Sequence, residues 1–235
     1  MINNSKNAKG FTLIEILFAL FIGLLLMGTI YVSMISGQRS SVALEGKITA
    51  QQDVRAVLEV MALEIGMASY NPNFVPNIWL NPGGCPNPGL SLNQAYKGIQ
   101  VATPNSVTLE MDTGESSVIR DNTNEMIWYV YDTANQRITR ETNCGGAQPF
   151  LGEVPGTPGR SVRVINNTLN IPMFRYFNGM GVEIPVASLP AGIPNIRRIE
   201  ITLAVETEDI DPNTMGRRRM IYSTSVIPRN HAINL

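Results

Sequence analysis

Glu15 is the residue of this chain whose type and position most need a chemical explanation. It lies near the start of an apolar run, and from Ile16 to Gln38 the sequence contains no Asp, Glu, Lys or Arg. A run of about 20 apolar residues is long enough to cross a bilayer. A carboxylate inside such a run costs on the order of 2.5–3.5 kcal/mol at the bilayer centre. Either a partner charge offsets that cost, or the function of the chain requires the carboxylate.

The other reactive residues form no recognised catalytic or metal-binding pattern. His231 is the only histidine, and we expect a solvent-exposed tail residue there rather than a member of a Ser–His–Asp triad. No G-x-S-x-G, Walker A or H-E-x-x-H motif occurs. Two cysteines, Cys85 and Cys144, and one distant histidine fall short of the four ligands usual for zinc. We therefore predict no enzyme activity, no cofactor and no metal.

Two acidic stretches and one basic run leave alternatives open. Asp121 to Glu125 and Asp209 to Asp211 offer oxygen ligands of the kind calcium takes, but neither has EF-hand spacing, so polar turns are favoured. The basic run, Arg217 to Arg219, could contact DNA. A solvated hairpin loop is the favoured interpretation, because acidic residues precede it closely: Glu206, Glu208, Asp209 and Asp211. The net charge of −1 also makes nucleic acid an unfavoured partner.

Charges around the apolar run predict the orientation of the chain. Lys6 and Lys9 precede the run, whereas the first charge after it, Arg39, is soon balanced by Glu45. The positive-inside rule then places the N-terminus in the cytoplasm and the bulk outside, which means the periplasm in a bacterium with two membranes. No convincing small-residue cleavage site follows the run. A single-pass periplasmic enzyme or binding protein with an uncleaved anchor is therefore one interpretation.

The stretch from Lys9 to Glu15, KGFTLIE, resembles the processing site of type IV prepilins and type II secretion pseudopilins. In that family a prepilin peptidase cuts after the glycine and methylates the new N-terminal residue. The resemblance implies cleavage between Gly10 and Phe11 and N-methylation of Phe11. It also implies that Glu15 meets the new amine of a neighbouring subunit and sets the register of assembly. This pairing answers the problem of Glu15, because an unpaired buried charge is far more costly than a paired one.

A long helix must position these residues. From Gly37 to Tyr70 there is no proline, and apolar residues recur at steps of three and four, as on one face of an amphipathic helix: Val54, Val57, Leu58, Met61, Ile65 and Ala68. We predict a leader peptide at residues 1–10 and then one helix from Phe11 to about Ser69. Its membrane and assembly half is 11–37 and its amphipathic half 38–70. Asn71-Pro72 is expected to end it.

Strand patterns dominate the remainder, residues 71–235, which we predict to be one periplasmic β-rich domain. Met126 to Tyr131 and Gln136 to Arg140 indicate a β-hairpin. Further strands are predicted at 106–111, 161–165, 169–177, 199–205 and 220–227, with Pro172 forcing its segment to an edge or splitting it. The predicted fold class is α+β: a long N-terminal helix packed on an antiparallel β-sheet domain, as in type IV pilins.

The predicted periplasmic location bears on the two cysteines. In that oxidising compartment a Cys85–Cys144 disulfide is the leading prediction, and two buried free thiols are the alternative.

The order of elements resembles the PilW-type minor pilins and the related J-type pseudopilins. The segments that carry this likeness are 127–131, 173–177, 196–203 and 226–230. The resemblance implies a low-abundance subunit that begins in the inner membrane and then joins a pilus fibre. There it helps other minor and major pilins to prime assembly, at or near the tip. A minor pseudopilin of a type II secretion system is the alternative.

Overall fold

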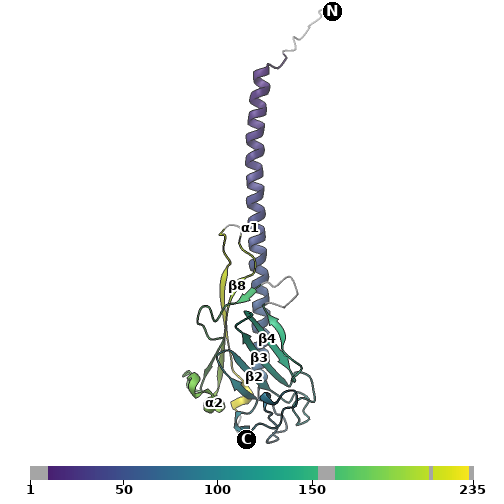
Figure 1. Cartoon of the computed structure of the whole chain (residues 1–235), viewed down its shortest axis with the longest axis vertical. Helices are drawn as coiled ribbons and strands as arrows, with labels where there is room; N and C mark the ends of the chain where they lie inside the picture. Colours follow the sequence, from purple (N-terminus) through teal and green to yellow (C-terminus); the bar gives the residue numbers. More distant parts are fainter. Residues whose placement is uncertain (1–9, 153–161, 212–213, 233–235) are drawn as a thin grey trace, which may run out of the picture.

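A single helix, α1 (Leu13–Met67), extends far beyond the β-rich domain that packs on its C-terminal part (Figure 1). The computed structural model describes residues 10–152, 162–211 and 214–232. With 55 residues, α1 is about 80 Å long. Its apolar N-terminal part is long enough to cross a membrane and is not buried by the rest of the chain. The predicted α+β fold is confirmed.

The predicted amphipathic face is the face that α1 buries against the domain. The buried residues of the helix are Ala50, Val54, Val57, Leu58, Met61 and Ile65. The helix ends slightly earlier than Asn71-Pro72, because Ser69 adopts a positive φ of 65° and turns the chain away. The Ser69 N–H then donates to the Glu110 carbonyl at 2.8 Å, which ties the end of α1 to a strand.

The first sheet is a five-stranded antiparallel meander in chain order. Its central hairpin is the predicted one, with Ile127 opposite Thr142 and Asp132 opposite Arg137. Its first and last strands are short and were not predicted. The strands are β1 (Ile99–Ala102), β2 (Ser106–Glu110), β3 (Met126–Asp132), β4 (Arg137–Thr142) and β5 (Gln148–Leu151).

A second antiparallel sheet is built around β8 (Arg198–Thr207). One edge of β8 pairs with β6 (Val162–Val164) and then β7 (Phe174–Phe177), and the other edge pairs with β9 (Arg219–Val226). Only the last four residues of the predicted strand 169–177 form β7, beyond Pro172. The described part of the domain therefore contains two sheets.

The main core lies where the two sheets meet α1. Its largest fully buried side chains include Tyr129, Tyr176, Phe174 and Met61. Short helical elements close the ends of the domain: α2 (Leu189–Gly192), η1 (Pro82–Gly84), η2 (Gln94–Tyr96), η3 (Val186–Ser188), η4 (Ile193–Asn195) and η5 (Arg229–Ala232).

Candidate functional site

The Glu15 carboxylate caps the N-terminus of α1. Its Oε2 accepts hydrogen bonds from the Thr12 N–H and the Thr12 hydroxyl, both at 2.8 Å. The Thr12 Oγ1 in turn accepts the Glu15 N–H at 3.3 Å. This reciprocal pattern is a capping box, which satisfies backbone donors that a helix start leaves open. Thr12 therefore supplies hydrogen bonds to the carboxylate, and among the residues that the structure describes no cation pairs with it.

Sequence reasoning overlooked the part played by Thr12. The signal was present, because Thr12-Leu13-Ile14-Glu15 has the T-x-x-E spacing of a capping box ahead of an apolar run. The resemblance of the stretch to a processing site concerns Gly10, Phe11 and Glu15 and implies nothing about Thr12. Thr12 belongs with those residues, since it holds the carboxylate at the end of the helix.

The residues around Glu15 line a shallow groove along one face of α1. Ala19 and Gly23 follow Glu15 at steps of four, so no bulky side chain covers the helix backbone along this stripe. Larger apolar residues form the rims, and the full lining is Phe11, Glu15, Ile16, Ala19, Leu20, Gly23, Leu24 and Met27. Small residues at this spacing allow the backbone of another helix to approach closely within a membrane.

The bond predicted to be cut lies ahead of the helix. Gly10 and Phe11 are exposed and precede α1, and Phe11 keeps 86% of its surface accessible. The rest of the predicted leader, residues 1–9, lies outside the described residues. The bond is therefore exposed and lies ahead of the helix, where a peptidase can reach it.

Cys85 and Cys144 form a disulfide. It joins the loop that follows α1 to the turn after β4, across a sequence separation of 59 residues. Both cysteines pack on a small apolar cluster separate from the main core, made of Ile78, Trp79, Ile119 and Met126. The bridge thus fastens the loop to the first sheet beside its own small core.

His231 is not an exposed tail residue, contrary to the sequence-based expectation. Its side chain is fully buried. The Ser69 hydroxyl lies 2.8 Å from Nδ1, and Nε2 lies 2.8 Å from the Ile193 carbonyl. Because a carbonyl only accepts, Nε2 carries the proton and Nδ1 accepts from Ser69. Burial, with weaker effects from the Lys97 and Arg197 cations, lowers the pKa of His231 to about 4 despite its bond to the Ile193 carbonyl.

The Ser69–His231 pair belongs to a set of hydrogen bonds between the C-terminal turn and the end of α1. Ser69 Oγ also accepts the Gly98 N–H at 3.0 Å. Lys97 Nζ donates to the His231 carbonyl at 3.3 Å, and Asn230 Nδ2 donates to the Met67 carbonyl at 3.4 Å. These bonds hold the C-terminal turn η5 against the end of α1.

The acidic stretches and the basic run bind one another or the backbone. The Glu125 carboxylate accepts the backbone N–H groups of Gly114, Arg120 and Asn122, as expected of a polar turn. In the basic run, Arg217, Arg218 and Arg219 pair with Glu208, Asp211 and Glu206 respectively. Within the described residues, no three His, Cys, Asp or Glu side chains lie close enough to hold a metal ion.

A buried carboxyl that the sequence did not single out lies on β2. Glu110 is fully buried, and its Oε2 accepts the Leu80 N–H at 2.9 Å. Burial raises the pKa of Glu110 well above its usual range, and the bond from Leu80 only partly opposes this. An isolated acidic residue in a β-branched strand gives no sequence signal of such burial.

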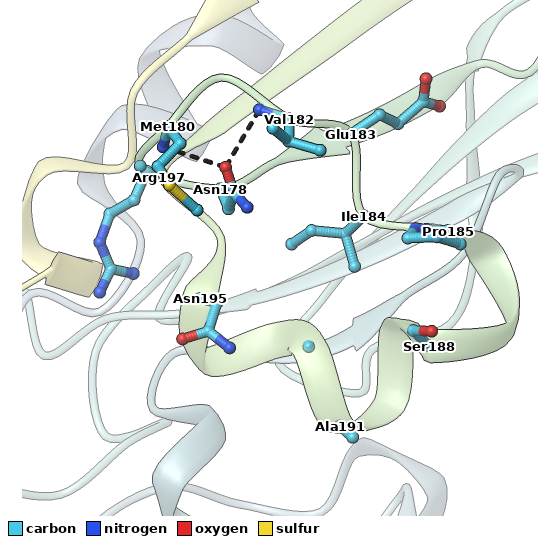
Figure 2. Close-up of a pocket in the computed structure, with 12 residues that line it drawn as sticks. Asn178, Met180, Val182, Glu183, Ile184, Pro185, Ser188, Ala191, Asn195 and Arg197 are labelled. Carbon is cyan, nitrogen blue, oxygen red and sulfur yellow. Dashed lines mark hydrogen bonds between the residues drawn. The ribbon is translucent and has the colours of Figure 1, made fainter.

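A second groove lies within the β7–β8 connection, between residues 178–185 and the segment 188–197 that contains the short helix α2 (Figure 2). It has a volume of about 700 Å³, and its apolar lining includes Met180, Val182, Ile184 and Pro185. Several of its polar groups are already engaged: Asn178 Oδ1 accepts the N–H groups of Met180 and Val182. Arg197 donates to two backbone carbonyls and Glu183 pairs with Arg175. The groove therefore offers a mainly apolar surface.

Comparison with known proteins bears on the N-terminal site. Residues 5–31 match the family model described as the prokaryotic N-terminal methylation motif. This chain carries a type IV pilin-like prepilin signal. The motif implies processing by a prepilin peptidase and assembly with other pilins, and with the apolar helix it supports anchoring by one membrane helix. No curated protein and no solved structure is similar enough to the chain to be matched.

Proposed function

We propose that the chain is a minor type IV pilin subunit that is cut between Gly10 and Phe11, methylated on Phe11 and built into a pilus through α1. The observation that carries the proposal is the methylation motif at residues 5–31, which lies on an exposed helix start. That helix continues into an apolar stretch that the chain itself does not bury. A helix with this surface needs lipid or other helices around it.

The assembly step follows from the charges created by cleavage. Cutting after Gly10 frees the amine of Phe11, which is cationic at neutral pH. Glu15 and Phe11 line the same groove, which is shallow along Ala19 and Gly23. A neighbouring helix in this groove would bring its own Phe11 amine to Glu15, and the ion pair would replace the Thr12 bonds. Only one axial offset pairs the two charges, so Glu15 sets the register.

The minor role rests on the shape and resemblance of the chain. The globular domain packs on the C-terminal part of α1 only and is large beside it (Figure 1). Such bulk at every position would crowd a fibre wall, whereas one copy at or near the tip, priming assembly with other minor and major pilins, would not. Residues 11–37 supply the assembly surface, and 38–70 and 71–235 form the periplasmic part.

Intact mass measurement of the membrane-extracted full chain, with and without a prepilin peptidase, tests this function. We expect a chain that begins at Phe11 and is heavier by one methylene group, only when the peptidase is present. Gly10→Val is the matched control, because a Cβ at Gly10 meets no atom within 4 Å, so the variant keeps its fold while the cut is blocked.

A chain that still begins at Met1 beside an active peptidase would overturn the proposal. The apolar run would then be an uncleaved anchor, and the domain would be assayed as a periplasmic binding protein or enzyme. If the processed chain crosslinks to subunits of a secretion fibre rather than to pilins, the alternative of a minor pseudopilin replaces the pilus assignment.

A further inference from the structure

The first sheet has a second covered face, which points away from the main core. Val107 and Leu109 of β2 belong to that core. Because side chains alternate along a strand, Thr108 and Glu110 point to the opposite side of the sheet, where both are fully buried. The loop after α1 provides the cover, since the Leu80 N–H donates to Glu110 Oε2 at 2.9 Å.

β3 adds Trp128 to this face. Trp128 is directly opposite Thr108 in the ladder, and Met126 is directly opposite Glu110. Directly opposite residues have Cβ atoms about 5 Å apart, and two residues along a strand span about 7 Å. The side chains of Thr108, Glu110 and Trp128 are therefore neighbours, and we call these three residues the loop-side patch.

The loop is held over the loop-side patch at several points. Ile78 and Trp79 share the small apolar cluster with Met126. Gln94 Nε2 donates to the Trp79 carbonyl at 2.8 Å, and Gln94 Oε1 accepts the Trp79 N–H at 3.2 Å. The disulfide joins the same loop to the turn after β4. A small molecule enclosed beneath this loop would exchange slowly with the solvent.

Each residue of the loop-side patch has a buried polar atom with no hydrogen-bond partner among the described residues. These atoms are Thr108 Oγ1, Glu110 Oε1 and Trp128 Nε1. Trp128 as a whole is partly exposed, but its Nε1 is buried. An unpaired buried polar atom costs free energy, and in folded proteins nearly all such atoms bind protein or ordered water. Three of them on one patch indicate a partner that they share.

The hydrogen-bonding character of the three atoms limits what that partner can be. The indole N–H of Trp128 only donates, the Thr108 hydroxyl donates and accepts, and the Glu110 carboxyl accepts, or donates when it is protonated. A metal cation would face the indole N–H, and an anion would face the carboxyl oxygen. An apolar group would leave all three atoms unpaired. Water both donates and accepts, so it can pair with all of them.

We propose that the loop-side patch binds enclosed water, which accepts the Trp128 indole N–H and bonds to Thr108 Oγ1 and Glu110 Oε1. Buried waters in proteins make about three hydrogen bonds, which matches the unpaired atoms of the patch. Because Leu80 already binds Glu110 Oε2, the carboxyl connects the loop with the water. The proposal does not rest on the proposed function, since cutting after Gly10 and assembly through α1 leave this face unchanged.

Nuclear magnetic resonance of the full-length chain in detergent micelles tests the proposal. The chain has two tryptophans, so labelling their indole nitrogens with ¹⁵N gives two signals, which a Trp79→Phe variant assigns. Magnetisation transfer from water to the Trp128 indole proton is measured in the laboratory and rotating frames. The two transfers have opposite signs when the water is held for longer than the molecule tumbles, and equal signs for direct proton exchange. We expect opposite signs at Trp128.

Thr108→Val removes one bond to the water while nearly keeping the shape of the side chain. We expect the transfer to Trp128 to weaken at least about 5-fold in this variant, because the water loses one of its partners. Thr139→Val is the matched control. Thr139 is buried on the same side of the sheet, but its hydroxyl already donates to the Val130 carbonyl at 3.4 Å, so the transfer to Trp128 should stay unchanged.

Urea unfolding of Thr108→Val gives a second measurement whose sign depends on the water. If Thr108 Oγ1 bonds to water, valine breaks that bond, and we expect a lower urea midpoint than in the parent. If Thr108 Oγ1 has no partner, valine removes an unpaired polar atom, and the midpoint rises. The transfer experiment on the parent chain needs no substitution of the patch, so it decides the proposal even if Thr108→Val does not fold.

Three results would overturn the proposal. One is the absence of transfer from long-held water to the Trp128 indole proton in the parent, and another is a raised urea midpoint in Thr108→Val. The third is a urea midpoint that rises with added calcium or potassium in the parent but not in Glu110→Gln, because the occupant would then be a cation. None of these results depends on processing at Gly10, so they are separate from failure of the proposed function.

Discussion

His231 couples the stability of the domain to pH because burial keeps its imidazole neutral. In the folded chain its pKa is about 4, and the usual value is 6.5. The unfolded chain therefore binds a proton more readily between those values, so stability is full above pH 6.5 and is lost as the pH falls toward 4. A difference of this size corresponds to about 3 kcal/mol.

Replacing His231 by Gln should remove that pH dependence. At pH 7 we expect the variant to unfold about 1–2 kcal/mol more easily, because hydrogen bonds to Ser69 or Ile193 are weakened. At pH 4.5 the difference in the free energy of unfolding between variant and parent should close or reverse, because Gln takes up no proton. Urea denaturation of the full chain in detergent, followed by tryptophan fluorescence, measures both. Ser69→Ala is the control, and its free energy of unfolding should still fall between pH 6.5 and 4 as in the parent. An equal dependence on pH in the parent and in His231→Gln would show that His231 is not the group responsible.

Glu110 gives the stability of the domain the opposite dependence on pH. Because burial raises its pKa, its contribution to stability is full at low pH and is lost as the pH rises above the usual carboxyl value. Glu110→Gln keeps an acceptor for the Leu80 N–H without the charge. We expect this variant to be at least as stable as the parent at pH 7, and to lose less stability between pH 5 and 8 in the same urea assay. A variant that is much less stable at pH 7 would show that the ionised carboxylate is needed.

Between elements, an ion pair connects α1 to the first sheet. Arg140 on β4 binds Glu64 on α1 through two nitrogens, at 3.1 and 2.5 Å, and the Tyr129 hydroxyl donates to the same carboxylate. Both charged side chains are mostly buried. Arg140→Met leaves Glu64 without its cation, and we expect a loss of about 1–3 kcal/mol in the free energy of unfolding.

Adding Glu64→Gln to Arg140→Met should restore part of that loss, because the uncompensated carboxylate is then gone. Calorimetry of the single and double variants measures the recovery. Additive losses in the double variant would mean that the pair contributes packing rather than charge.

The disulfide should matter most for the loop after α1. Closing a loop of 59 residues contributes about 4 kcal/mol in the chain-entropy model. In a Cys85→Ser, Cys144→Ser variant we expect faster proteolysis at residues 71–98 and a lower melting temperature, while β8 and β9 keep their protection in hydrogen exchange. Equal loss of protection in both sheets would instead show that the bridge supports the whole domain.

Which elements could be predicted depended on how local their signals were. The buried face of α1, the β3–β4 hairpin and β8 repeat their patterns over many residues. β1 and β5 have four residues each, and β5 contains Pro149, so neither repeats a pattern long enough to detect. His231 was misplaced because Ser69, its partner, is 162 residues away in sequence. The Thr12–Glu15 capping box was local and detectable.

In the whole molecule, α1 joins two environments that need different surfaces. Its first part is apolar on every side, and its last part buries one stripe in the domain. Because the helix is continuous through Gly37 and Gly46, a shift of the apolar part along a fibre moves the domain with it. If Glu15 sets the register, as we propose, it also sets the height at which the domain is presented along the fibre.

Glu15→Leu tests this link between residue and fibre. The variant removes the carboxylate from the apolar run, so it should stay inserted in the membrane at least as well as the parent and still be cut after Gly10. Without a partner for the Phe11 amine of its neighbour, it should enter sheared fibres at least about 10-fold less, a difference of about 1.4 kcal/mol. Immunoblots of membrane and sheared fractions measure both steps.

Glu45→Leu is the control, because Glu45 is an exposed carboxylate on the same helix beyond the apolar run. This control variant should enter fibres normally. Normal incorporation of Glu15→Leu would mean that helix packing alone, through the face containing Ala19 and Gly23, sets the register.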